Sequence, residues 1–354
     1  MKKINGKFQL PREIQSVEML RGIAAAMVCY FHLARGNREY LPDDSLVKMF
    51  GKWGWAGVEI FFVISGFVIP LAMYRKRYSI KNFFTFFKKR VIRIEPPYLV
   101  SILMVIGLNF ASTLSPYYRG GEFHIDWSNL AMHVAYLNVF TDNSWLNPVY
   151  WSLAIEFQYY LLIALSFGLL VSDKIYFRLL FFVAFAALSF LPLPENRFVL
   201  TYSGYFIIGI VLFQYLSNII NRYEFYGILA GASLLIFWQF GLALTFIVLL
   251  TVLLIAFINK VPRFLRYLGL ISYSLYLVHV PIGGRIINIA EIKINSVFLK
   301  ECMVFVAFGV CIVASIVFYR LFENWFKTFS ASIKYKEPTK QTPGKETREA
   351  AAVN

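Results

Sequence analysis

The sequence predicts an all-α polytopic membrane protein with about ten transmembrane helices and both termini in the cytoplasm. Composition is the first observation behind this prediction: 58% of the 354 residues are hydrophobic and 18% are aromatic, whereas 16% are charged. Soluble domains carry about 25% charged residues, and one soluble domain of this size could not bury so much apolar surface. The other two observations are the division of the apolar residues into long separate runs and the concentration of Lys and Arg in alternate loops.

Ten apolar segments are candidate membrane spans, since a helix that crosses the hydrocarbon core of a bilayer has about 20 mostly apolar residues. They are Val17–Leu33, Trp53–Met73, Pro96–Leu114, Trp151–Leu170, Ile175–Leu191, Val199–Leu216, Phe225–Phe240, Leu242–Ile258, Leu265–Ile287 and Leu299–Phe322. The seventh and eighth are separated only by Gly241, so this pair could form a hairpin or one broken re-entrant element. No internal repeat is visible in the sequence, which argues against transporters built from repeated halves.

The basic residues predict the orientation of these helices. If the N-terminus is cytoplasmic, most Lys and Arg residues fall in inner loops, as the positive-inside rule requires. The same distribution explains the net charge of +15 without a nucleic-acid partner. We therefore expect a cytoplasmic segment over residues 1–16, a membrane domain over 17–326, and a disordered cytoplasmic tail over 327–354, where the sequence is polar.

Two stretches outside the predicted spans have a character of their own. Tyr78–Ile94 mixes aromatic and basic residues, which favours a helix lying at the inner membrane surface. Ser115–Tyr150 is the longest outer loop, and Trp127–Phe140 within it could form a second interfacial helix. His124 and His133 also lie in this loop without further ligands at metal-site spacing. We interpret them as solvated or loop-packing residues and predict no metal site.

The first span contains two ionisable residues, Arg21 and His32. At 100° and 1.5 Å per residue, they lie on the same side of the helix and about 16 Å apart along its axis. Arg21 is expected towards the cytoplasm and His32 towards the outside. An ionisable residue within a span is costly, so each is a functional candidate by default. The alternative is that each side chain merely snorkels to its nearest interface.

Three further ionisable residues lie within predicted spans at about the depth of His32. They are Glu59 in the second span, Glu156 in the fourth and His279 in the ninth. A histidine with a carboxylate partner suits general base catalysis, because the imidazole takes a proton near neutral pH and the carboxylate stabilises the resulting cation. We therefore expect His32, Glu59 and Glu156 to act in catalysis. The alternative is a structural ion-pair or hydrogen-bond network inside the helix bundle.

A pair of basic residues precedes the third predicted span on the inner side. Arg90 and Arg93 are three residues apart and therefore share one helical face. Two guanidinium groups on one face can hold a phosphate group through bidentate hydrogen bonds. The alternative is a positive-inside signal that binds anionic lipid headgroups, which suits Lys88 better.

Six segments, taken together and in order, resemble the motifs of the integral-membrane acyltransferase-3 family. This family contains the O-acyltransferases of bacterial surface polysaccharides. The resemblance extends from about Ile14 to Phe326. The six segments are MLRGIAAAMVCYFH (Met19–His32), GVEIFFVISGFVI (Gly57–Ile69), KKRVIRIEPPY (Lys88–Tyr98), WSLAIEFQYY (Trp151–Tyr160), ISYSLYLVH (Ile271–His279) and YRLFEN (Tyr319–Asn324).

This resemblance implies transfer of an acyl group, expected to be acetyl, from acyl-CoA to a hydroxyl of a cell-surface polysaccharide or lipid-linked oligosaccharide. It implies acyl-CoA as a co-substrate without a permanently bound cofactor, and a location in the bacterial cytoplasmic (inner) membrane. The roles it implies are acyl-CoA binding by Arg21, Arg90 and Arg93, chemistry at His32 with Glu156 and Glu59, and support from Trp151, Ser65, Tyr276 and His279.

A non-enzymatic alternative remains open at this stage. The buried charges could form the proton or substrate path of a transporter, or of a flippase for a glycan or glycolipid intermediate. The predicted positions of the charged residues favour an enzyme. The pair of arginines that suits phosphate is expected on the cytoplasmic side of the membrane, and the histidine and glutamate residues are expected towards its outer side.

Overall fold

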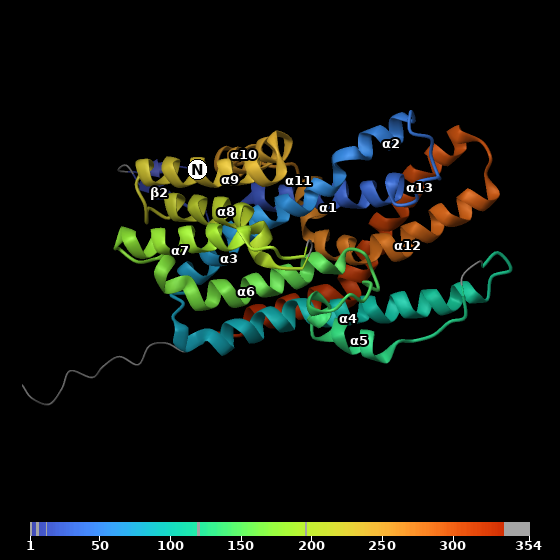
Figure 1. Cartoon of the computed structure of the whole chain (residues 1–354), viewed down its shortest axis with the longest axis horizontal. Helices are drawn as coiled ribbons and strands as arrows, with labels where there is room; N and C mark the ends of the chain where they lie inside the picture. Colours follow the sequence, from blue (N-terminus) through green and yellow to red (C-terminus); the bar gives the residue numbers. More distant parts are fainter. Residues whose placement is uncertain (1, 5–6, 12, 119–120, 195–196, 336–354) are drawn as a thin grey trace, which may run out of the picture.

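The computed structural model describes residues 2–4, 7–11, 13–118, 121–194 and 197–335. Within these ranges, the chain is an all-α polytopic membrane protein that also carries one small β-hairpin (Figure 1). The helices are α1 (Gln15–Arg35), α2 (Leu46–Phe50), α3 (Gly57–Arg75), α4 (Phe83–Thr113), α5 (Trp127–Val134), α6 (Tyr150–Leu170), α7 (Ile175–Ala187), α8 (Ser203–Leu216), α9 (Arg222–Phe240), α10 (Leu242–Phe257), α11 (Arg263–Leu270), α12 (Ser272–Lys293), α13 (Val297–Phe318) and α14 (Asn324–Ser332).

The ten predicted spans all coincide with helical segments. Seven helical segments of the described chain are long and apolar enough to cross a membrane. Two more, Ile175–Phe190 and Leu242–Phe257, are apolar but shorter, and Phe225–Phe240 lies within α9. The number of crossings therefore stays a prediction. The chain turns at Gly241, whose φ of +85° is accessible to glycine, so α9 and α10 are separate helices.

Helix α4 corrects one prediction. The surface helix expected over Tyr78–Ile94 is not separate, because a single helix continues from Phe83 to Thr113 through Pro96 and Pro97. Two prolines inside a helix remove two backbone donors and usually break it. Here the Tyr273 hydroxyl of α12 donates to the Ile94 carbonyl oxygen at 2.8 Å. The carbonyls that lose an N–H partner to the prolines are those of Ile92 and Arg93, so this bond instead ties the adjacent turn of α4 to α12.

The interfacial helix expected over Trp127–Phe140 is interrupted. Helix α5 ends at Val134, and a 3₁₀ turn follows over Leu137–Phe140. Between them, Tyr136 adopts a left-handed conformation with φ of +55°. Its ring is buried and stacks on Tyr98 and Phe157, with centroids 4.9 and 5.0 Å apart. The outer loop therefore inserts a side chain into the bundle, and this insertion separates the two helical turns.

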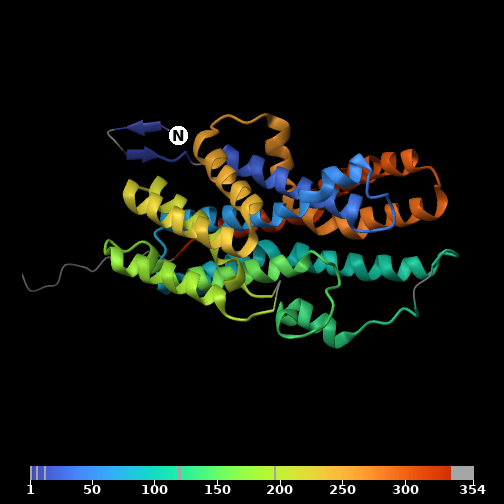
Figure 2. The ribbon, with the colours of Figure 1, turned by 45° about the horizontal axis from the view of Figure 1, so that its top comes forward.

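The N-terminal segment contains structure that the sequence analysis did not predict. Strands β1 (Lys2–Ile4) and β2 (Lys7–Gln9) pair in antiparallel fashion (Figure 2). The backbone N–H of Phe8 donates to the Asn218 side chain at 3.0 Å, and that side chain donates back to the Phe8 carbonyl at 3.1 Å. Two reciprocal bonds thus hold the hairpin against the connection between α8 and α9.

The last described residues pack on the bundle. Helix α14 extends to Ser332, beyond residue 326, where the membrane domain was expected to end. The Lys89 ammonium donates to the Ser330 and Ile333 carbonyls, and Tyr335 contacts the Tyr78 ring. Residues 336–354, which contain most of the predicted tail, lie outside the described residues.

Pro11, close to the start of the described chain, and Tyr335, at its end, both contact residues beside the connection between α3 and α4. The Arg75 guanidinium donates to the Pro11 carbonyl at 2.6 Å, and Tyr335 reaches Tyr78. The prediction that both termini lie on one side of the membrane requires such a placement.

Glycines allow two pairs of helices to cross closely. A Cβ atom on Gly209 of α8 would lie 2.1 Å from the Val63 carbonyl oxygen, and one on Gly66 of α3 would lie 2.4 Å from that of Phe206. Both distances are too short for any side chain, so glycine is required on each side of this crossing. A Cβ on Gly269 would likewise lie 1.9 Å from the Glu18 carbonyl oxygen, where α11 crosses α1. Small residues have this role in many membrane helices.

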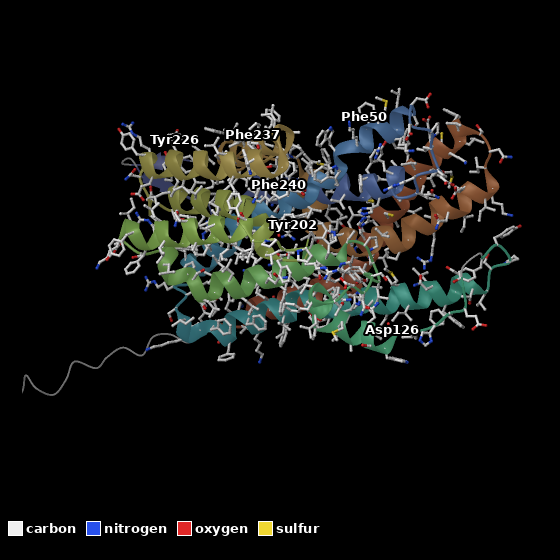
Figure 3. All side chains as sticks on the ribbon, viewed as in Figure 1. Phe50, Asp126, Tyr202, Tyr226, Phe237 and Phe240 are labelled. Atoms are coloured by element: carbon white, nitrogen blue, oxygen red, sulfur yellow. The ribbon has the colours of Figure 1, made fainter. Side chains whose placement is uncertain are left out.

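Large aromatic side chains cover the outside of the bundle. Phe50 of α2 is 81% exposed, and Tyr226 and Phe237 of α9 are 61% and 51% exposed (Figure 3). In a soluble protein, such a surface would promote association. In a polytopic membrane protein, lipid covers it, in agreement with the composition of the chain.

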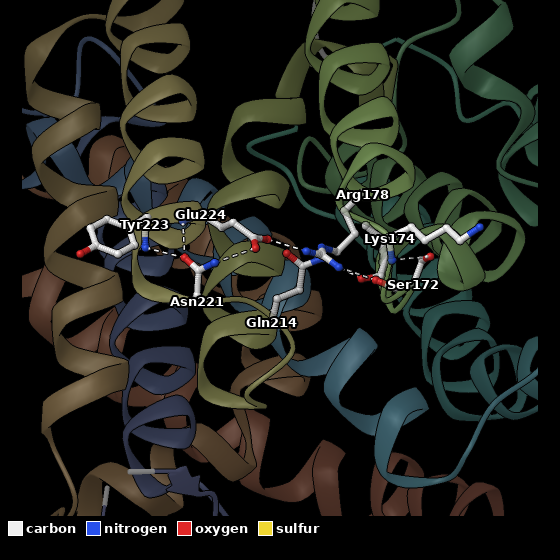
Figure 4. A network of polar contacts seen from close by, with 8 residues as sticks. Ser172, Lys174, Arg178, Gln214, Asn221, Tyr223 and Glu224 are labelled. Carbon is white, nitrogen blue, oxygen red and sulfur yellow. Dashed lines mark hydrogen bonds and ion pairs between the residues drawn. The ribbon is translucent and has the colours of Figure 1, made fainter.

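A buried ion pair joins α7 to the start of α9 (Figure 4). The Arg178 guanidinium donates to the Glu224 carboxylate at 2.5 Å and to the Ser172 carbonyl. The Asn221 side chain accepts from the backbone N–H of Glu224 and donates to its carboxylate. Arg178 is only 4% exposed, so these bonds to its two terminal nitrogens offset part of the cost of burying a cation.

Candidate active site

Three arginines from two helices meet at one cavity of about 110 Å³, which we call the arginine cavity. Arg21 comes from α1, while Arg90 and Arg93 come from α4. The last two share a face, as their spacing predicted. The other polar residues that line the cavity are Ser65, Ser152, Glu156, Tyr160, Ser272, Tyr273, Tyr276 and Glu323.

The three guanidinium groups of the arginine cavity have no carboxylate partner in the described part of the chain, where the ion pairs involve other residues. Arg90 instead lies over the rings of Phe86 and Tyr160, with distances of 5.3 and 5.2 Å to the ring centroids. Aromatic faces stabilise a cation but leave its N–H donors free. A cavity lined by three guanidinium groups is suited to a ligand that carries several negative charges.

Glu156 lies in the arginine cavity and not beside His32. Its Oε1 atom accepts hydrogen bonds from the Tyr160 hydroxyl at 2.5 Å and from Ser65 Oγ at 3.4 Å. This position corrects the expectation that Glu156 orients the imidazole of His32. The carboxylate instead supplies negative charge to a cavity that is otherwise strongly positive, and Ser65 supports it there.

Glu323 is a cavity residue that the sequence analysis did not assign to the site. It accepts hydrogen bonds from the backbone N–H and the hydroxyl of Ser274, at 3.1 and 2.6 Å. Ser274 lies in the first turn of α12, where backbone donors lack partners within the helix. Glu323 therefore binds the start of this helix from outside it. The sequence contained a reason to assign Glu323 to the site, since it is an acidic residue within one of the family motifs, YRLFEN.

A second cavity of about 380 Å³ contains His32, and we call it the histidine cavity. It also contains Glu59 from α3 and Trp151 from the start of α6. The remaining lining residues are Val28, Phe31, Trp55, Val58, Val149, Thr201, Tyr202, Phe240 and Tyr276. Thr201, Tyr202 and Phe240 were missed by the sequence analysis, because nothing in their own segments distinguishes them from other apolar or aromatic residues.

Glu59 is buried in the wall of the histidine cavity. Its side chain is 5% exposed, and its Oε2 atom has no hydrogen-bond partner among the described residues. Burial of a carboxylate oxygen without a partner carries a cost in free energy. Such an orphan acceptor is therefore a candidate to bind a ligand that donates a hydrogen bond.

His32 is hydrogen-bonded to another histidine. Its Nδ1 atom lies 2.9 Å from the Val28 carbonyl oxygen and 3.3 Å from Nε2 of His279. His279 in turn places Nδ1 2.9 Å from the Leu275 carbonyl oxygen. A carbonyl oxygen only accepts, so both Nδ1 atoms carry a hydrogen. Nε2 of His279 is then the acceptor for His32, and Nε2 of His32 keeps its lone pair for a proton.

The two cavities adjoin at Tyr276 and Val58, which line both of them. The Tyr276 hydroxyl lies 2.5 Å from Ser152 Oγ and donates to the Val149 carbonyl at 3.1 Å. These bonds hold the tyrosine ring at the boundary. Arg21 and His32 therefore serve neighbouring cavities from one face of α1, and their side chains do not simply extend to the nearest interface.

The predicted site residues thus divide into two groups. Arg21, Arg90 and Arg93 come together with Glu156 and Ser65, while His32 comes together with Glu59, Trp151 and His279; Tyr276 belongs to both groups. His133, interpreted as a loop-packing residue, is indeed buried in the outer loop, where its Nε2 accepts from the backbone N–H of Leu146 at 2.9 Å.

Comparisons with known proteins agree with the motifs. A family model described as "Acyltransferase domain" matches residues 14–320. The "Peptidoglycan O-acetyltransferase OatA" of Listeria monocytogenes is 25% identical over 89% of this chain and 57% of its own length. The "O-acetyltransferase OatA" of Staphylococcus aureus is 28% identical over 45% of this chain and 25% of its own length. The alignments thus cover less than two thirds of either relative. No solved structure matches the chain.

Proposed function

The chain belongs to the acyltransferase-domain family, and on that premise we propose that it transfers an acetyl group from acetyl-CoA to a hydroxyl group of a cell-wall polysaccharide. The printed names of the Listeria and Staphylococcus relatives support O-acetyl transfer, and the first of them supports a cell-wall acceptor. The apolar helices support a membrane location, which we propose to be the bacterial cytoplasmic membrane.

One observation carries this proposal: three guanidinium groups that form no ion pair with a carboxylate of the described residues line a cavity that adjoins the cavity of His32. The nucleotide end of CoA carries several phosphate charges, and these cannot enter hydrocarbon without compensation. Arg21, Arg90 and Arg93 provide that compensation. The slender uncharged arm of CoA then carries the thioester past Tyr276 towards His32.

The chemistry follows from the free lone pair on Nε2 of His32. This atom takes the proton of the acceptor hydroxyl while the oxygen attacks the carbonyl carbon of the thioester. A C–O bond forms, the C–S bond breaks, and the proton passes from His32 to the departing sulfur of CoA. General base catalysis of this kind contributes about 10²–10⁴-fold to the rate, and fixed positions for both substrates contribute more.

The arginine cavity is tested with purified protein in proteoliposomes, by following the release of free CoA thiol from acetyl-CoA and polysaccharide. The variant R90Q/R93Q is expected to raise the half-saturating acetyl-CoA concentration at least about tenfold, equivalent to about 1.4 kcal/mol. The control is Lys88→Gln, because Lys88 lies on the same helix but is exposed. This variant should leave the half-saturating acetyl-CoA concentration unchanged. Equal donor affinity in both variants would contradict a role for these arginines.

The base role is tested with His32→Gln, after its insertion into the membrane has been verified. Acyl transfer is expected to fall about 10²–10⁴-fold with little change in donor affinity. Normal transfer by the inserted variant would refute the mechanism. The same vesicles distinguish the transporter alternative, which predicts accumulation of substrate without consumption of acetyl-CoA.

A further inference from the structure

The lining of the histidine cavity differs chemically from that of the arginine cavity. Its aromatic residues are Phe31, Trp55, Trp151, Tyr202, Phe240 and Tyr276. Among the described lining residues there is one carboxylate, on Glu59, and no Lys or Arg. Such a cavity cannot neutralise phosphate groups, so the nucleotide end of the donor has no reason to bind there. Its lining is suited to an uncharged ligand with apolar faces and polar edges.

Three of these rings form a continuous wall, although they come from distant parts of the chain. Trp151, at the start of α6, lies 5.7 Å from Tyr202 between ring centroids, and the two planes are inclined by 33°. Tyr202 lies 6.1 Å from Phe240, at the end of α9, with planes inclined by only 13°. Figure 3 shows Tyr202 and Phe240 as neighbours from different elements. All three residues line the cavity, so this aromatic wall gives it one apolar side.

The carboxylate of Glu59 adds a directional requirement. Its Oε2 atom is buried without a hydrogen-bond partner among the described residues, and its side chain lines the same cavity as the aromatic wall. A hydroxyl group of a ligand would satisfy this acceptor by donating a hydrogen bond to it.

Resting on the proposed function, we propose that the histidine cavity is the acceptor subsite and holds one uncharged pyranose ring of the polysaccharide. The C–H face of the sugar packs on the aromatic wall of Trp151, Tyr202 and Phe240. One hydroxyl donates to Glu59, and the hydroxyl to be acylated lies at Nε2 of His32. The cavity volume of about 380 Å³ falls in the range of about 300–1,000 Å³ that is usual for small-molecule sites.

Two phenylalanines on α9 offer a matched test. Phe240 lines the cavity, whereas Phe237, three residues earlier, is 51% exposed on the outside (Figure 3). Acetyl transfer from radiolabelled acetyl-CoA is measured in proteoliposomes, with the polysaccharide of the producing bacterium after mild alkaline removal of its O-acetyl groups. Phe240→Ala is expected to raise the half-saturating polysaccharide concentration about tenfold without changing that of acetyl-CoA. Phe237→Ala is expected to change neither.

Phe240→Leu and Glu59→Gln complete the series. Leucine keeps most of the side-chain volume but removes the flat ring, so it tests the aromatic contact even if the alanine variant folds poorly. Glutamine keeps the shape of Glu59 but replaces one carboxyl oxygen with an amide NH₂ group, which donates hydrogen bonds and cannot accept one. Both variants are expected to weaken acceptor binding while leaving the donor half-saturation unchanged.

The outcomes separate this inference from the proposed function. If the wild-type protein transfers no label to the polysaccharide, the proposed function fails. If the wild-type protein transfers label and Phe240→Leu binds the polysaccharide as well as Phe237→Ala does, the acceptor subsite is refuted. A rise in the half-saturating concentration of acetyl-CoA alone would assign the cavity to the donor and would also overturn the inference.

Discussion

Nδ1 of His32 lies 3.3 Å from Nε2 of His279, so the proposed base is paired with a second imidazole where the sequence suggested a carboxylate. A neutral imidazole accepts the hydrogen bond from His32 but does not neutralise its charge. His279 therefore fixes the ring and tautomer of His32 without binding it as an ion pair. We interpret His279 as a positioning residue.

Removal of the His279 ring should slow the reaction without preventing donor binding. His279→Ala takes away one acceptor for the Nδ1 hydrogen of His32, while the Val28 carbonyl remains. The turnover number kcat is expected to fall about 10–100-fold, equivalent to about 1.4–2.7 kcal/mol, with the KM for acetyl-CoA unchanged. His279→Gln can still accept a hydrogen bond and should restore part of the rate. The control is His124→Ala in the exposed outer loop; a similar loss in that variant would contradict the positioning role.

The crossing of α3 and α8 should not tolerate even a methyl group. Gly209→Ala would place Cβ 2.1 Å from the Val63 carbonyl oxygen and 2.7 Å from the Phe67 nitrogen, both of them backbone atoms. The helices must separate, at a cost of about 1–3 kcal/mol, which should lower the Tm in detergent. Gly227→Ala on α9 has open space at the same position and should leave the Tm unchanged or raise it. Equal Tm values for the two variants would show that the helices do not cross this closely.

The buried ion pair of Arg178 and Glu224 should contribute more to the free energy of unfolding than an exposed ion pair does. Glu224→Gln leaves the Arg178 guanidinium buried without a counter-ion, and we expect a loss of about 3 kcal/mol in the free energy of unfolding. The control is Asp142→Asn, which removes the partner of Arg197. The Asp142 side chain is 99% exposed, so this loss should stay below about 1 kcal/mol. Thermal unfolding in detergent measures both. If the exposed pair cost as much as the buried one, burial would not determine the strength of the network.

The outer loop should loosen in acid because of His133. Burial lowers the pKa of this imidazole from its ordinary value of 6.5, and its Nε2 accepts from the Leu146 N–H. Above pH 6.5 the residue is neutral in both the folded and the unfolded loop. Below that value the unfolded loop is protonated first, so stability falls until the pH reaches the lower folded pKa. Hydrogen exchange at the Leu146 amide, normalised to its intrinsic rate, should therefore accelerate between pH 7.5 and 5. The variant His124→Gln should behave as the wild type, and exchange that is independent of pH would contradict the prediction.

The local parts of the site were predictable from the sequence. The helix period predicts Arg90 and Arg93 on one face, and Arg21 and His32 on one side of α1; in the structure the three arginines line one cavity and His32 lines the other. These predictions succeeded because each depends on a single helix of known geometry.

The partners across helices were less predictable. Glu156 and His32 appear at similar depths in the sequence, yet Glu156 bonds to Tyr160 and Ser65 and lines the other cavity. Depth along a helix does not determine its rotation, and the rotation decides which cavity a side chain lines. Tyr136 gives a second example, since a loop residue reaches the bundle interior by a conformation with positive φ that no periodicity predicts.

The sequence by itself determined that the chain is helical, spans a membrane and carries the motifs of its family, because the hydrophobic period and the cost of buried charge act within each segment. Only the tertiary structure decided that His279 is the partner of His32 and that Trp151, Tyr202 and Phe240 form one wall. These contacts depend on how closely and at what rotation the helices pack. Packing of that kind is a property of pairs of helices, which the pattern within a single helix does not contain.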